Sequence, residues 1–147
     1  MLTIEESVEI SRPPQTVYEF VADYRNAQRI LAGFESFEAL DTPTASLGAR
    51  IRATARIFGV RLDTVFEVVE LEPGRIIRTR SIEGPPGEST WRFEQSGAGS
   101  TVTLSMSVDT IGGLGGAIQQ MVAGTIRDTI RKSLGRLSRE LGPATVE

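Results

Sequence analysis

Few side chains in this sequence are suited to acid–base or nucleophilic chemistry. The 147 residues include no cysteine and no histidine, which excludes thiolate nucleophiles, zinc–thiolate sites and the usual general base near neutral pH. Proton transfer would depend on carboxylates, Tyr18, Tyr24 and Lys132. Glu35, Asp109 and Tyr24 lie near the ends of the cavity predicted below, where burial would raise the pKa of a carboxyl group. Their spacing shows no pair or triad, so each is interpreted first as a surface group, and no catalytic residue, metal site or cofactor is predicted.

The alternating apolar residues of the chain are better suited to binding a ligand than to catalysing a reaction. Ala53, Ala55, Thr64 and Thr79 are small for positions that face a covering helix, which leaves volume for a ligand. A packed core is the alternative for the whole set. The residues expected to line a ligand cavity are Phe34, Phe37, Ile51, Ala53, Ala55, Leu62, Thr64, Phe66, Ile77, Thr79, Trp91, Phe93, Leu104, Met106, Ile118, Met121 and Val122.

Trp91, the only tryptophan, fits two interpretations equally well. It could stack on a flat ligand, or it could fill the core with a partner for its indole N–H. For Met106, Met121 and Ile118 the core interpretation is favoured, because methionine fills gaps in any core.

The elements that must position these residues follow from hydrophobic periodicity. Alternation of period two predicts a strand over 2–10 and six more over 34–40, 49–58, 60–71, 75–83, 89–95 and 101–110. Broken alternation at Val68-Val69 indicates a bulge. Two short helices are expected between the first two strands, one after Pro13-Pro14 and one over 24–32. A final helix of about 25 residues, some 38 Å long, carries an apolar stripe that includes Val122, Ile126 and Ile130.

This order of elements predicts an α+β fold in a single domain, 1–147. Strands joined by short turns pair antiparallel, and a sheet with one apolar face needs a covering layer. We therefore expect a helix-grip fold: a curved, seven-stranded antiparallel sheet wrapped on a long C-terminal helix, with two short helices after the first strand. A space between sheet and helix would be the site of an apolar ligand.

The sequence also resembles a known family along essentially its whole length. The stretch "VEISRPPQTVYEFVADYRNAQRIL" is similar to the start of polyketide-cyclase-like proteins of the START-like (SRPBCC) superfamily. Its central hairpins, with Pro73-Gly74 at a turn, and the C-terminal "GGLGGAIQQMVAGTIRDTIRKSLGRLSRELG" resemble the same family. The resemblance implies the helix-grip fold and the enclosure of hydrophobic molecules such as lipids, polyketides, sterols or quinones.

Three functions are consistent with these observations. The first is binding or transport of a small hydrophobic molecule, lipid, polyketide or quinone-like. The second is a polyketide aromatase/cyclase-type enzyme, which would need polar groups inside the cavity. The third is a ribosome- or quinone-associated interaction protein.

Charge and hydropathy bear on the partners. The net charge of −3 argues against nucleic acid, and no stretch approaches the roughly 20 apolar residues of a transmembrane segment. Arginines such as Arg52 and Arg80 are expected on the outer face of the sheet, paired across strands; a shift of register by one residue would turn several inward. We expect a cytoplasmic protein, with a homodimer as a possible state.

Overall fold

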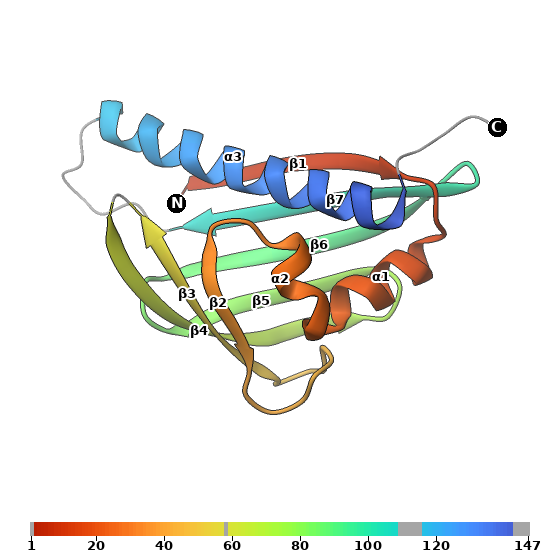
Figure 1. Ribbon diagram of the computed structural model, residues 1–147, viewed down its shortest axis with the longest axis horizontal. Coiled ribbons are helices and arrows are strands. Elements are labelled where there is room, and N and C mark those ends of the chain that lie inside the picture. Colours follow the sequence, from red (N-terminus) through yellow and green to blue (C-terminus); the bar gives the residue numbers. More distant parts are fainter. Residues whose placement is uncertain (1, 58, 109–115, 143–147) are drawn as a thin grey trace.

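The computed structural model describes residues 2–57, 59–108 and 116–142, excepting the side chains of 57 and 116–119. A strand and three short helical segments come first, then six strands and a long helix (Figure 1). The elements are β1 (Leu2–Ile10), α1 (Pro14–Ala22), the 3-10 turn η1 (Tyr24–Asn26), α2 (Ala27–Ile30), β2 (Phe34–Ala39), β3 (Arg50–Ile57), β4 (Val60–Glu72), β5 (Ile76–Glu83), β6 (Gly87–Ser96), β7 (Gly99–Val108) and α3 (Gly116–Leu141).

The strands form one antiparallel sheet in the order β1-β7-β6-β5-β4-β3-β2. Consecutive strands from β2 to β7 are neighbours, as expected where short turns join alternating segments. At the β4–β5 turn Gly74 has φ +78°, a conformation that glycine adopts without steric cost. The predicted bulge is confirmed, because the β4–β5 register shifts between Val68 and Glu70. The curled sheet and long C-terminal helix confirm the predicted helix-grip fold.

The second short helix differs from its prediction. Instead of one helix over 24–32, the chain forms the 3-10 turn η1 and a single α-helical turn, α2. Asp23 accepts a hydrogen bond from the backbone N–H of Arg25 at 3.0 Å, and it also forms a β-bridge with Thr44. These local bonds compete with a continuous helix.

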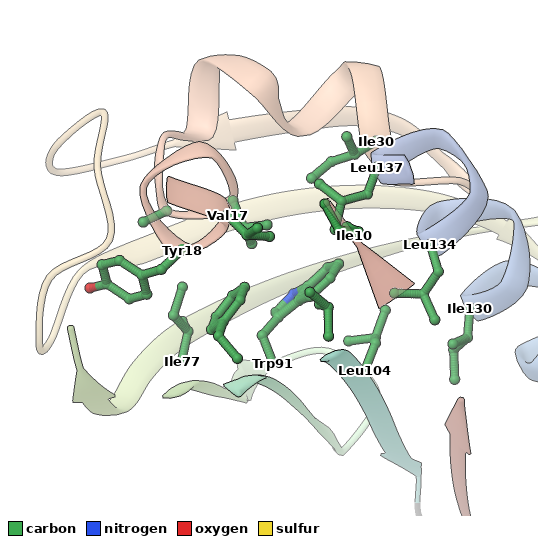
Figure 2. Close-up of a cluster of buried hydrophobic side chains, with 14 of the residues drawn as sticks. Ile10, Val17, Tyr18, Ile30, Ile77, Trp91, Leu104, Ile130, Leu134 and Leu137 are labelled. Carbon is green, nitrogen blue, oxygen red and sulfur yellow. The ribbon is translucent and has the colours of Figure 1, made fainter. Parts of the chain in front are cut away.

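The packed core occupies one end of the space between sheet and helices. Ile130, Leu134 and Leu137 of α3 are at most 3% exposed, and they contribute to the same cluster as Ile10 of β1 and Val17 of α1 (Figure 2). The C-terminal half of α3 and helix α1 therefore close this end tightly. The N-terminal half of α3 covers a cavity instead of a packed core.

Candidate ligand-binding cavity

A cavity of about 500 Å³ lies between the sheet and the N-terminal half of α3. Four central strands, β3 to β6, contribute inward-facing side chains because alternate residues of a strand point to the same face. Helix α3 contributes Val122, Ile126 and Thr129 to the cavity wall. These residues lie at three- and four-residue spacing, on one face of the helix. The structure thus contains the hollow that small inward-facing residues led us to expect.

Most of the residues expected to line the cavity do so in the structure. The sheet and α3 place these on its wall: Phe34, Phe37, Ile51, Ala55, Leu62, Thr64, Phe66, Ile77, Thr79, Trp91, Met106 and Val122. Trp91 belongs to both regions, because its ring also stacks on Phe93 with centroids 6.3 Å apart. Ligand binding by these side chains remains a prediction.

Other expected wall residues lie elsewhere. Phe93 and Leu104 belong to the packed core, where α1 covers Phe93 and the Tyr18 ring meets it edge-on at 5.7 Å. Ala53 is 1% exposed but does not reach the cavity; it pairs with Phe37 and Thr64, whose larger side chains line the wall.

Placement of Met121 on the cavity wall was wrong, because its side chain is 58% exposed. One residue along a helix rotates the side chain by about 100°, so that Val122 faces inward while Met121 faces outward. The side chain of Ile118 and the whole of Asp109 lie outside the described residues.

Several wall residues were not predicted. Ile126 and Thr129 come from α3, Leu31 from the end of the short helical region, and Ser89 from β6. Ile126 lies on the apolar stripe of the final helix, so that signal was present in the sequence. Nothing in the pattern of 24–32 indicated which of its side chains would face the cavity.

Some polar groups on and near the wall are paired with each other. The hydroxyl groups of Thr79 and Ser89 hydrogen-bond to each other across β5 and β6 at 2.7 Å. At the rim, Arg56 pairs with Glu35 at 2.7 Å and Arg80 pairs with Glu88 at 3.0 Å. Glu35, a candidate acid–base group, is therefore a half-exposed partner of an arginine and not a buried carboxyl group.

Tyr24 combines a ring on the cavity wall with a buried hydroxyl group. Its ring packs on Phe37 with centroids 5.8 Å apart, and no residue in the described part of the chain hydrogen-bonds to its hydroxyl. Burial raises the pKa of Tyr24 above its usual value, because the apolar surroundings disfavour the phenolate. The group therefore stays protonated near neutral pH.

Most arginines of the sheet face outward, so the inward register does not occur; Arg56 borders the rim of the cavity. Arg50, Arg52, Arg61, Arg80 and Arg92 are exposed. Pairs form within and across strands, for example Arg78 with Glu70 at 3.2 Å.

Two kinds of feature are absent from the described ranges. No group of three or more metal-ligating side chains occurs among these residues. None of the helices they form is long and apolar enough to cross a membrane.

Comparisons with known proteins agree with this geometry. In the helix-grip class of fold, a curled antiparallel sheet wraps around a long helix. This chain has that arrangement, with an apolar cavity between the two. The family model described as "Polyketide cyclase / dehydrase and lipid transport" matches residues 1–142. The chain belongs to this family. Among curated proteins no relative matches the chain.

Solved structures share the fold at low sequence identity. A protein from Thermus thermophilus superposes with a TM-score of 0.82 at 24% identity, covering 95% of this chain and 97% of that one. A START superfamily protein from Mycobacterium smegmatis gives 0.72 at 15% identity, covering 94% and 98%. A major latex-like protein from Panax ginseng gives 0.72 at 10% identity, covering 97% and 98%.

Proposed function

We propose that this protein binds or carries a small hydrophobic molecule, lipid, polyketide or quinone-like, in the cavity beneath α3. The observation that carries the proposal is the hollow itself: about 500 Å³, within the roughly 300–1,000 Å³ of small-molecule sites. Its wall consists mainly of aliphatic and aromatic side chains, which favour an apolar occupant. The family description, which includes lipid transport, agrees with this function.

A cyclase-type enzyme is the second candidate, and the same family description favours it. Such an enzyme would orient a poly-β-keto chain and supply polar groups at the reacting atoms. In the described part of the wall, the hydroxyls of Thr79 and Ser89 bind each other, and the carboxylate of Glu88 pairs with Arg80. The buried hydroxyl of Tyr24 has no partner there, but it is a single group and forms no acid–base pair. Binding without reaction therefore accounts better for the described residues.

The test uses two neighbouring positions on α3. Val122 lies on the cavity wall and Met121 is exposed. We expect Val122→Trp to fill part of the hollow and weaken binding of the neutral probe N-phenyl-1-naphthylamine by about tenfold or more, because overpacked space excludes a ligand. Met121→Trp adds the same side chain on the exposed side and should leave the affinity unchanged.

Fluorescence titration of the purified protein measures both affinities, and native mass spectrometry of the same sample detects any molecule retained from the cell. Equal affinities for the two variants would contradict binding in the cavity, as would absence of probe binding by the wild-type protein. A cytoplasmic location and a homodimer remain predictions, which cell fractionation and analytical ultracentrifugation check.

A further inference from the structure

A smaller pocket of about 250 Å³ lies beside the cavity. It is formed where α2 contacts both β2 and α3. Four residues, Ala27, Leu31, Phe34 and Phe37, border both spaces. The two spaces are therefore adjacent and share part of their walls.

The pocket contains a cation whose hydrogen-bonding capacity is mostly unused. Arg136 of α3 is half-buried there, and its Nη1 donates to the carbonyl oxygen of Leu31 at 3.3 Å. A guanidinium group has five N–H donors in a fork that matches a carboxylate. Within the described ranges of the chain, no carboxylate oxygen lies within the 4.0 Å of an ion pair with Arg136.

The other charge that borders the pocket is already neutralised. Glu35 accepts a hydrogen bond from Nε of Arg56 at 2.7 Å, and Arg56 belongs to the rim of the large cavity. Of Glu35, Arg56 and Arg136, only Arg136 therefore carries a charge that is not paired within the described chain. A half-buried cation beside an apolar space favours an anionic group that can bind its fork.

We infer that the ligand is an amphiphilic carboxylic acid, whose apolar body fills the cavity while its carboxylate pairs with Arg136 in the small pocket. This inference rests on the proposed function and adds the class of ligand. The carboxylate accepts hydrogen bonds from the unused N–H groups of Arg136, and Phe34 and Phe37 contact the chain where it passes from one space to the other.

The experiment compares dodecanoate with dodecan-1-ol, which have the same chain and different head groups. Without a cation the alcohol should bind better, because an unpaired carboxylate loses its hydration. With Arg136 we expect dodecanoate to bind about tenfold more tightly than the alcohol. Displacement of N-phenyl-1-naphthylamine, at a pH where the acid is ionised, measures both affinities.

Three variants assign the preference to one residue. Arg136→Gln should abolish the preference for the acid and leave the affinity for the alcohol unchanged, which also shows that the cavity is intact. Arg136→Lys keeps the charge and should retain most of the preference. Arg139→Gln removes an exposed arginine of the same helix and should behave as wild type.

The outcomes distinguish this inference from the function on which it rests. If wild type binds neither the probe nor the two compounds, both are wrong; if it binds the probe but neither compound, only the inference is overturned. If it binds the alcohol as tightly as the acid, or if Arg136→Gln keeps the acid preference, the inference is overturned and the cavity remains a hydrophobic site. The wild-type comparison decides the matter even where a variant does not fold.

Discussion

At the scale of single residues, side chains that look alike in the sequence have different surroundings in the structure. Val122 and Met121 are neighbours, yet one lines the hollow and the other is exposed. Tyr24 presents its ring to the hollow while its hydroxyl is buried without a partner in the described chain. An unsatisfied buried hydroxyl destabilises the folded state.

Replacing Tyr24 with phenylalanine should therefore stabilise the protein. We expect Tyr24→Phe to raise the free energy of unfolding by about 1 kcal/mol, because it removes the desolvated hydroxyl and keeps the ring on Phe37. Urea denaturation followed by circular dichroism measures the change. Tyr18→Phe is the matched control, since Tyr18 has no such buried, unpartnered hydroxyl, and it should give no gain. A loss of stability in Tyr24→Phe would show that the hydroxyl has a partner in solution.

At the scale of elements, one connection between strands borders the cavity. The β5–β6 connection lines the cavity with Pro85 and Pro86, as does Gly87 at the start of β6. Gly84 begins this connection with φ +90°, and an added Cβ would collide with the backbone oxygen of Asp63 in β4. The connection thus lies directly on the neighbouring strand.

Gly84→Ala should be strongly destabilising for two separable reasons. The left-handed backbone costs about 1–2 kcal/mol for a residue with a Cβ, and the collision with backbone adds to it. Gly97→Ala isolates the first cost, because Gly97 has φ +58° and open space around it. We expect Gly84→Ala to lower the free energy of unfolding by at least about 1 kcal/mol more than Gly97→Ala. Equal losses in urea denaturation would show that β4 moves aside freely.

At the scale of the whole molecule, α3 has two unequal halves. Its C-terminal half closes a packed core around Ile130 and Leu137 (Figure 2), whereas its N-terminal half covers the hollow. Figure 1 shows the helix running along the sheet over β1 and β7, with the strongly curved β3 and β4 beneath its N-terminal half. The side chains that line an empty cavity lack packing contacts on that side.

Filling the hollow should consequently stabilise the fold. A ligand that binds only the folded state at about 100 times its dissociation constant adds about 2.7 kcal/mol. For a chain of this size, that corresponds to a rise in Tm of about 5–10 °C. Differential scanning fluorimetry with dodecanoate tests this in wild type, and Val122→Trp, with less space to fill, should show a smaller rise. An unchanged Tm in wild type at saturating ligand would contradict binding to the folded state.

Local sequence determined which face of each element is apolar. Period-two alternation identified the strands, and three- and four-residue spacing identified the inward stripe of α3, because side-chain direction follows from backbone geometry alone. The Val68-Val69 break located the bulge for the same reason. The class of fold followed from the order of these elements.

Only the tertiary structure decided which inward residues meet a hollow and which meet a packed neighbour. Phe66 and Phe93 are both inward-facing phenylalanines of alternating strands, yet Phe66 lines the cavity and Phe93 is covered by α1 and Tyr18. The placement of Arg136 beside Leu31 likewise joins segments that are 105 residues apart. Such contacts depend on the curvature of the sheet and the distance of α3 from it, which are set by all the packed layers together.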